Sequence, residues 1–196
     1  LNAADYGVLQ NRKRIILVGW INEQDHGFPN ISTCRSEAIV NNILSDLPIL
    51  KAGEVKNVAP YIGQINTYLE ESGIRSNEDM FVTQNISRPV NENDASIYNY
   101  AIRTWSNKRV RVKYTDLPPK MRTQKNEDSF LDRFKVVDGN GLSHTIVAHL
   151  AKDGHYYIHP CLEVCRSISV REAARIQSFP DNFYFEGSRS AAFKQI

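Results

Sequence analysis

A short apolar stretch that follows three evenly spaced polar side chains constrains the fold most. Residues 15–19 read Ile-Ile-Leu-Val-Gly and come after Gln10, Arg12 and Arg14. A continuous apolar run of this length is typical of a buried strand, so we predict a strand from Arg14 to Trp20. Side chains two apart point the same way on an extended chain. The three polar groups are therefore expected on one face, at a sheet edge or cleft, where they would suit an anion or a base; a solvated strand edge is the alternative.

Three segments carry apolar residues at helical spacing. The pattern in residues 36–47 stops before Pro48, and that in residues 61–75 includes Gly73 as a C-cap. Residues 93–105 form a third apolar stripe. Each segment is predicted to be an amphipathic helix.

A fourth helix has a sequence signal at its first turn. Ser169 and Glu172 form a capping box, in which each side chain accepts a hydrogen bond from a backbone amide at the helix start. The helical sequence Arg-Glu-Ala-Ala-Arg-Ile-Gln follows directly. We expect loss of the Ser169 cap to cost about 1 kcal/mol.

The middle of the chain is locally basic although the whole chain is close to neutral. Residues 103–135 hold ten Lys or Arg against four Asp or Glu. Residues 109–114 alternate charged with β-branched or aromatic side chains, which predicts a strand with one cationic face. Residues 136–160 carry turn signals at 138–141 and 153–154 between β-rich runs, which predicts a hairpin or small meander.

Composition restricts the class of protein but not its activity. The 196 residues are 41% hydrophobic and 23% charged with a net charge of +2, as in soluble globular proteins. No apolar run approaches the roughly 20 residues of a membrane span, and no leader pattern is present, so a cytoplasmic location is expected. Three cysteines, Cys34, Cys161 and Cys165, are expected to stay reduced. The start at Leu1 and the abrupt C-terminal end suggest a fragment.

Two stretches together resemble late motifs of the DNA cytosine-5 methyltransferases. Residues 6–14 resemble Tyr-Gly-Val-Pro-Gln-x-Arg-x-Arg, with Leu9 in place of proline. Residues 166–183 resemble Arg-x-Leu-Thr-x-Arg-Glu-x-Ala-Arg-x-Gln-Ser-Phe-Pro, and 143–160 are similar to the end of the family's target recognition domain. The last residues, Phe-Lys-Gln-Ile, look like the start of its final motif. Residues 20–142 are compatible only in length and character.

The resemblance implies an α+β architecture made of parts of two domains. Residues 1–19 would supply a strand and the Gln-x-Arg-x-Arg motif to an α/β catalytic domain. Residues 20–163 would form a small mixed target recognition domain. Residues 164–196 would return a helix and the start of the final motif to the catalytic domain. Apolar surface is expected to be exposed where the rest of the catalytic sheet is missing, and the fragment could self-associate through it, whereas the parent protein is expected to be a monomer.

The reaction implied is transfer of a methyl group from S-adenosylmethionine to C5 of a cytosine flipped out of duplex DNA, after a cysteine thiolate attacks C6. The Pro-Cys nucleophile loop, the Glu-Asn-Val carboxylate and the Gly-rich cofactor turn are absent from their expected places. We therefore expect the fragment to be inactive and to bind no cofactor. Pro160-Cys161 imitates the nucleophile pair but precedes the capping-box helix, which is the wrong context. His155, His159, Cys161 and Cys165 could form a zinc site by residue type, although no metal is predicted.

Individual roles follow from the resemblance. Arg14 would bind O2 of the flipped cytosine, while Gln10 and Arg12 would hold phosphate or the closed catalytic loop, because guanidinium groups stay charged and donate in a planar fork. Thr145 would lie beside the backbone of the flipped nucleotide. The cations expected to supply DNA contacts, each with a solvated side chain as the alternative, are Lys108, Arg109, Arg111, Lys113, Lys120, Arg122 and Lys125. The residues of the second motif expected to have structural roles are Ser169, Arg171, Glu172, Arg175 and Gln177.

Double-stranded DNA is the partner implied, in a bacterial restriction-modification system with a cognate endonuclease. The alternative is a DNA-binding module derived from a degenerate methyltransferase, for which Leu9 in place of proline is the positive hint. No membrane partner is expected.

Overall fold

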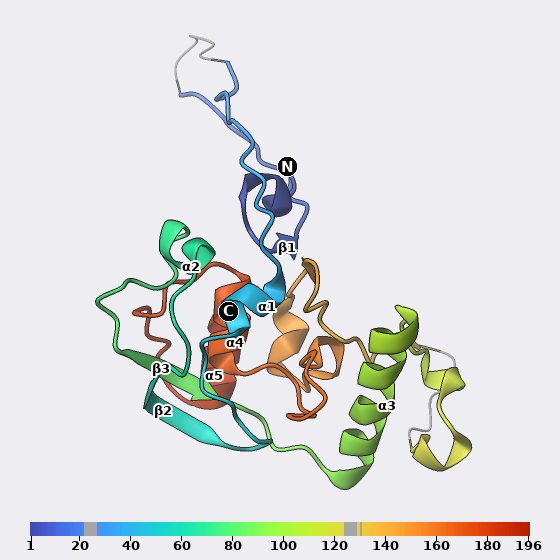
Figure 1. The fold of residues 1–196 in the computed structure, drawn as a ribbon. Helices are drawn as coiled ribbons and strands as arrows, with labels where there is room; N and C mark the ends of the chain where they lie inside the picture. Colours follow the sequence, from blue (N-terminus) through green and yellow to red (C-terminus); the bar gives the residue numbers. More distant parts are fainter. Residues whose placement is uncertain (22–26, 124–128, 130) are drawn as a thin grey trace.

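The computed structural model describes residues 1–21, 27–123, 129 and 131–196 (Figure 1). The α-helices are α1 (Val40–Leu44), α2 (Thr67–Glu71), α3 (Glu92–Lys108), α4 (Val170–Ile176) and α5 (Arg189–Gln195). Short 3-10 helices are η1 (Ala3–Tyr6), η2 (Tyr114–Asp116), η3 (Pro119–Met121), η4 (Ala148–Ala151) and η5 (His155–Tyr157). The strands are β1 (Gln10–Asn11), β2 (Val55–Pro60), β3 (Phe81–Ile86) and β4 (Ser143–His144). This mixture of helices and short strands confirms the predicted α+β class.

Within the described residues, the strands form two separate pairs. Strands β2 and β3 are antiparallel, with Val55 opposite Ile86 and Pro60 opposite Phe81. Strands β1 and β4 are parallel, with Gln10 opposite Ser143. The β1–β4 pair joins parts of the chain that are far apart in sequence, as parallel pairing requires.

Helix α4 lies at the centre of the main hydrophobic core. All seven of its residues are buried, and it packs against β3, α1 and α5. Figure 1 shows α4 and α5 in the middle of the molecule, with the β2–β3 pair on one side and α3 on the other. A surface helix normally exposes one face to solvent. Because α4 is buried on every side, its charged side chains need partners inside the protein.

Helix α3 organises a second core. Its buried residues Ile97, Tyr98, Ala101 and Ile102 pack with side chains from the segment that follows it. The N-cap is Asn91, whose side chain accepts a hydrogen bond from the Asp94 amide. The predicted helix at 93–105 is therefore confirmed, and it continues to Lys108. None of the helices in the described part of the chain combines the length and apolar character of a membrane span.

The predicted buried strand from Arg14 to Trp20 is wrong. This segment has no regular secondary structure and runs away from the two cores with the rest of the N-terminal region (Figure 1). Ile15 is 90% exposed and Leu17 is 91% exposed. An apolar strand needs neighbours that pair its backbone and cover both faces, and the described residues provide neither. The exposed apolar surface expected near this end is present.

The other two predicted β regions also differ from the structure. Residues 109–114 are not in a strand, although the predicted alternation persists as exposed Arg111 and Lys113 beside buried Val112 and Tyr114. Residues 136–160 contain β4, η4 and η5 instead of a hairpin or meander. Alternation fixes which side chains face the core, but it does not supply a partner strand.

The predicted helices at 36–47 and 61–75 form over shorter spans. Helix α1 begins after Ile39, where the Asn42 side chain accepts a hydrogen bond from the Ile39 amide at 2.7 Å. Helix α2 begins after Asn66, whose side chain accepts from the Leu69 amide. Just past its end Gly73 has a φ of 68°, the left-handed conformation that glycine adopts without steric cost.

Candidate nucleic-acid and cytosine site

The first motif region meets the 143–160 stretch where β1 pairs with β4. Leu9, just before β1, is buried in the main core, and its carbonyl accepts a hydrogen bond from the Ser143 amide at 3.0 Å. The next residues continue as the parallel pair, with Asn11 opposite His144. Leucine at the position where the family pattern has proline is thus accommodated as a core residue.

Arg12 ties this junction to the second motif. One guanidinium nitrogen, Nη1, donates to the Ile146 carbonyl at 2.7 Å, to the Gln177 side chain at 3.2 Å and to the Gln10 side chain at 3.4 Å. Burial lowers the pKa of Arg12, and the charge of Arg14 adds to this. Arg12 therefore acts as a bracket between β1, the segment after β4 and the end of α4.

Gln10 and Thr145 complete the junction. Gln10 is fully buried, and its Nε2 has no hydrogen-bond partner among the described residues. The Thr145 hydroxyl donates to the Asn11 carbonyl at 2.6 Å. The Tyr157 hydroxyl donates to the Thr145 carbonyl at 3.2 Å. A buried amide without a partner is costly and uncommon, and such groups concentrate at functional sites.

Arg14 is held differently from Arg12. It is exposed, and its Nη1 donates to the neighbouring Lys13 carbonyl at 2.7 Å. Its backbone amide donates to the Leu1 carbonyl at 2.8 Å. The backbone at Arg14 is therefore fixed while its guanidinium remains accessible from solvent.

His144 is held neutral beside this junction. Its ring stacks on Tyr157 at 5.1 Å between centroids, and its Nε2 lies 2.6 Å from the Tyr156 carbonyl. A carbonyl only accepts, so Nε2 carries the proton in the neutral ring. The pKa of His144 is lowered to about 4, mainly by burial and also by the charges of Arg111 and Lys135, against the opposing effect of the Tyr156 carbonyl.

The capping box of α4 forms as the sequence predicts. Glu172 accepts a hydrogen bond from the Ser169 amide at 2.7 Å, and Ser169 Oγ accepts from the Glu172 amide at 3.1 Å. Arg166 donates to both carboxylate oxygens, at 2.7 and 2.8 Å. Burial alone would raise the pKa of Glu172, but the charge of Arg166, then that of His159, bring it down to about 2.

The arginines of α4 hold surrounding segments. Arg175 binds the carboxylates of Asp46 and Asp181, and all three are buried. Arg171 donates to the Thr83 carbonyl at 2.9 Å. Sequence analysis did not identify Asp46, Asp181 or Arg166 as partners of the charged side chains of α4. Asp46 is far from Arg175 in the sequence, and only the tertiary fold brings the two together.

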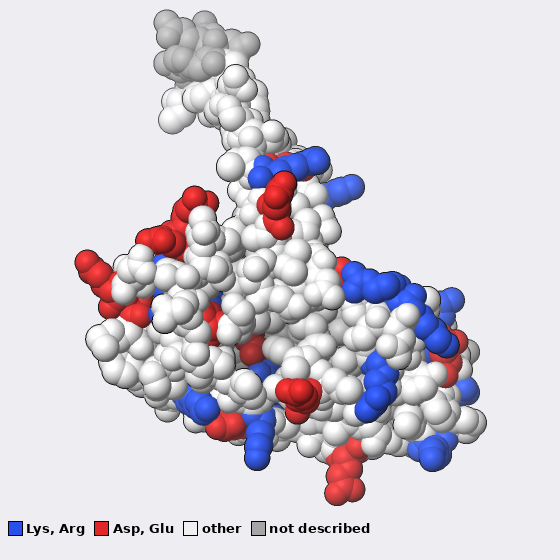
Figure 2. Space-filling model, in the orientation of Figure 1, with Lys and Arg blue, Asp and Glu red and all other residues white. Residues whose placement is uncertain are grey.

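The predicted DNA-contacting cations lie along the end of α3 and the segment after it. Figure 2 shows Lys and Arg gathered over the α3 side of this face, with Asp and Glu over the α2 side. Lys108 ends α3, Lys113 and Lys120 are exposed, and Arg122 donates to the Leu117 carbonyl at 2.8 Å. Lys125 lies outside the described residues.

Two of these cations share an aromatic neighbour. The guanidinium of Arg109 lies 4.5 Å from the centroid of the Trp105 ring, and that of Arg111 lies 5.4 Å from it. Arg109 also forms an ion pair with Asp138 at 2.7 Å. Lys135, which sequence analysis did not select, places its Nζ 5.0 Å from the centroid of the Tyr156 ring. The Tyr156 carbonyl is hydrogen-bonded to His144, so the basic surface approaches β4.

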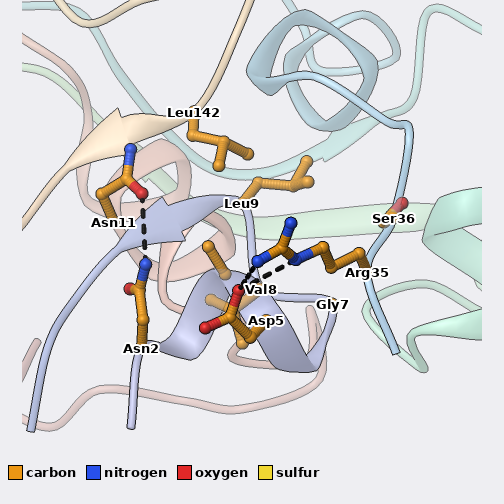
Figure 3. A pocket seen from close by; sticks show the side chains of 10 residues that line it. Asn2, Asp5, Gly7, Val8, Leu9, Asn11, Arg35, Ser36 and Leu142 are labelled. Carbon is orange, nitrogen blue, oxygen red and sulfur yellow. Dashed lines mark hydrogen bonds and ion pairs between the residues drawn. The ribbon is translucent and has the colours of Figure 1, made fainter. Parts of the chain in front are cut away.

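A hollow of about 270 Å³ lies on the N-terminal side of β1 (Figure 3). Its wall includes an ion pair between Arg35 and Asp5 at 2.7 Å and a hydrogen bond between the Asn2 and Asn11 side chains. Gly7 has a φ of 86° there, and a Cβ at this position would lie 3.2 Å from the Cys34 carbonyl. The hollow thus borders the same Asn11 whose carbonyl binds Thr145.

The possible zinc ligands do not converge. Across residues 1–21, 27–123, 129 and 131–196, no three His, Cys, Asp or Glu side chains are placed to share a metal ion. His155 is hydrogen-bonded to the Tyr98 hydroxyl at 2.8 Å, and His159 Nδ1 accepts from the Cys161 amide at 3.0 Å. The Nδ1 atoms of both histidines are thus occupied within the protein.

A profile of the family described as C-5 cytosine-specific DNA methylase matches residues 1–196. The chain belongs to this family. The sequence match spans the first motif region, the β4 stretch paired with it and the second motif region, which Arg12 contacts through Gln177. The family match therefore covers the whole of the given sequence, including residues 20–142.

Similar proteins include named type II methyltransferases. M.Bpa9945I of Bacillus paralicheniformis is 42% identical over 207 residues, covering 100% of this chain and 46% of the relative. M.XorII of Xanthomonas oryzae is 29% identical over 205 residues, covering 100% of this chain and 45% of the relative. M.DdeI of Desulfomicrobium norvegicum is 28% identical over 201 residues, covering 97% of this chain and 45% of the relative. The chain thus spans about half the length of the curated relatives it matches.

Methyltransferases of this family generally use S-adenosylmethionine. The turn glycines Gly139 and Gly141 are closely packed in this structure. A Cβ at Gly139 would collide with the Asn41 side chain, and one at Gly141 would collide with the Asp138 side chain. These two glycines are therefore required by packing inside the domain.

Proposed function

We propose that this chain is the DNA-recognition part of a DNA cytosine-5 methyltransferase and that its β1–β4 junction receives the flipped cytosine. The observation that carries this proposal is the Arg12 bracket, which joins Gln10, Ile146 and Gln177 in one place. These residues come from both family motifs and from the end of the intervening region. Their convergence supports a shared site.

Arg12 and Arg14 would have different roles in the site. Arg12 already uses its guanidinium to hold the junction together, so we assign it a positioning role. Arg14 is exposed and fixed at its backbone, which suits a side chain that reaches a base entering from solvent. A guanidinium donates well to a carbonyl oxygen such as O2 of cytosine. Thr145, bound to the Asn11 carbonyl, would lie beside the nucleotide backbone.

Duplex DNA would run from this junction over the basic surface near α3. Lysine and arginine contacts to phosphate supply affinity and register, whereas base edges supply sequence specificity. Lys135 lies over the ring of Tyr156, whose carbonyl is hydrogen-bonded to His144, so this surface reaches β4. S-adenosylmethionine would be held elsewhere in the full-length protein, and the recognised sequence would be that of a bacterial restriction-modification system.

The proposed role of Arg14 is tested by separating methyl transfer from binding in the full-length protein. Arg14→Ala should reduce the methyl-transfer rate roughly a hundredfold, because the group it binds is presented only after flipping. Duplex affinity should change little. Lys13→Ala is the matched control, since Lys13 is the adjacent exposed cation, and it should leave the methyl-transfer rate near that of the unmodified protein.

Equal losses of methyl transfer and duplex affinity in Arg14→Ala would reject a role specific to the flipped base. A full-length protein that binds duplex DNA but never consumes S-adenosylmethionine would instead support the non-catalytic DNA-binding module.

A further inference from the structure

Arg109, the C-cap residue of α3, connects two parts of the proposed DNA surface. Arg109 follows the end of α3, and its backbone amide donates to the Trp105 carbonyl at 2.9 Å. Its guanidinium lies over the Trp105 ring and binds Asp138 at 2.7 Å. Asp138 begins the turn that leads into β4. One side chain therefore joins the end of α3 to the strand that pairs with β1.

The backbone of Arg109 is in a conformation that its side chain disfavours. Its φ is 55°, in the left-handed region where a helix end usually has glycine or asparagine. Arginine at such a position carries a conformational cost without contributing core packing. This cost is unexplained by the fold alone, since a glycine would end the helix equally well.

The turn at Asp138 is tied firmly to its surroundings. One carboxylate oxygen of Asp138 accepts from the Asn140 amide at 3.2 Å. The Gly139 carbonyl accepts from the Asn41 amide at 2.9 Å, and the Gly141 carbonyl accepts from the Val40 amide at 3.0 Å. The turn thus rests on the start of α1, and it keeps its shape without the ion pair to Arg109.

The ion pair itself is only partly shielded from water. The side chain of Arg109 is 49% exposed and that of Asp138 is 18% exposed. Ion pairs this close to solvent are weak and are screened by salt. A DNA phosphate could therefore compete with Asp138 for the guanidinium, while Trp105 keeps Arg109 at the helix end through the ring contact.

We propose that Arg109 exchanges Asp138 for a DNA phosphate when duplex DNA binds. In the free protein, Asp138 holds the guanidinium and lowers the net positive charge at the end of α3. On binding, the guanidinium moves from the carboxylate to a phosphate, while the hydrogen bonds to Asn41 and Val40 keep the turn before β4 in place. This inference rests on the proposed DNA-binding function and adds a charge exchange to it.

The test uses the full-length protein and a labelled duplex of mixed sequence, with affinity measured by fluorescence anisotropy from about 50 to 200 mM salt. Arg109→Asn removes the charge with a residue that tolerates the left-handed conformation. Its slope of log affinity against log salt should fall in magnitude by about 0.9, the value of one phosphate contact. Arg109→Lys should restore the slope.

Asp138→Asn supplies the second arm, because asparagine retains an oxygen that can accept from the Asn140 amide. This variant should bind the duplex more tightly than the unmodified protein at about 50 mM salt, where charge effects are largest. The gain should disappear in the double variant with Arg109→Asn. The matched control is the Arg35–Asp5 ion pair, which also spans 2.7 Å, and Asp5→Asn should leave the slope unchanged.

An unchanged slope in a folded Arg109→Asn protein would overturn the exchange. An affinity gain from Asp138→Asn that persists without Arg109 would also overturn it, because the carboxylate would then act only by repelling DNA. Absence of salt-dependent duplex binding by the unmodified protein would instead reject the proposed function on which the exchange rests.

Discussion

Replacing Glu172 with glutamine tests how α4 is stabilised. The carboxylate accepts two hydrogen bonds from Arg166 and one from the Ser169 amide, all between 2.7 and 2.8 Å. Both charged side chains are almost fully buried, at 1% exposure for Arg166 and 4% for Glu172. Glutamine preserves the volume but leaves the Arg166 charge without a counterion in the interior. Breaking a buried pair in this way costs about 3–5 kcal/mol.

The pKa of Glu172 gives the contribution of its ionised form to stability. The folded protein lowers this pKa from 4.5 to about 2, and each unit corresponds to about 1.4 kcal/mol. A depressed carboxyl pKa stabilises the fold above the unfolded pKa, and this contribution is lost as pH falls through the folded pKa. The contribution of the charged form is therefore about 3 kcal/mol at pH 7 and about 1.5 kcal/mol at pH 3.

Hydrogen exchange measured by mass spectrometry on the α4 peptide of the full-length protein reports the local opening free energy. At pH 7 the Glu172→Gln variant should lose about a hundredfold of the α4 protection, which corresponds to about 3 kcal/mol. The control is Glu163→Gln, which changes an exposed glutamate nearby and should alter stability by less than about 0.5 kcal/mol. A loss below about tenfold for Glu172→Gln would refute the buried-pair reasoning.

Three further predictions follow from other parts of the structure. Lowering the pH from 7 to 5 should reduce the free energy of unfolding through His144, because its pKa of about 4 in the folded protein means that the unfolded chain binds more protons below pH 6.5. His144→Phe keeps a ring against Tyr157 and cannot be protonated. In urea unfolding, this variant should lose about 2 kcal/mol less free energy of unfolding between pH 7 and pH 5. Gln177→Ala removes an acceptor of Arg12 and should lower the methyl-transfer rate more than duplex affinity; equal changes in both assays would contradict the bracket role. Ser169→Ala should destabilise α4 by about 1 kcal/mol in hydrogen exchange, with no change taken as evidence against the cap.

Local signals located α1 to α4, with α1 and α2 shorter than predicted, but they did not indicate α5 and they predicted the strands poorly. The Ser169 cap was predictable because all its partners lie within one helical turn. Strands β2 and β3 were not predicted from the sequence, since buried polar residues such as Gln84 and Asn85 interrupt any apolar pattern. Gln84 has a φ of 53° and exchanges hydrogen bonds with Phe185, a partner that no local pattern indicates.

The sequence selected candidate site residues but did not indicate their contacts. Gln10, Arg12 and Arg14 were selected by their spacing and by the family resemblance. Their shared strand face did not form, because the expected strand lacks neighbours among the described residues. Arg12 instead reaches Gln177 from a distant segment, a contact that depends on tertiary packing. The DNA contacts of the cations between Lys108 and Lys125 stay predictions.

The most direct test of the central claim is bisulfite sequencing of plasmid DNA from cells that express the full-length protein, beside the Arg14→Ala variant. We predict 5-methylcytosine at one recurring short sequence with the unmodified protein and its near loss with Arg14→Ala. Absence of 5-methylcytosine in cells whose unmodified protein is folded and binds duplex DNA would contradict the claim.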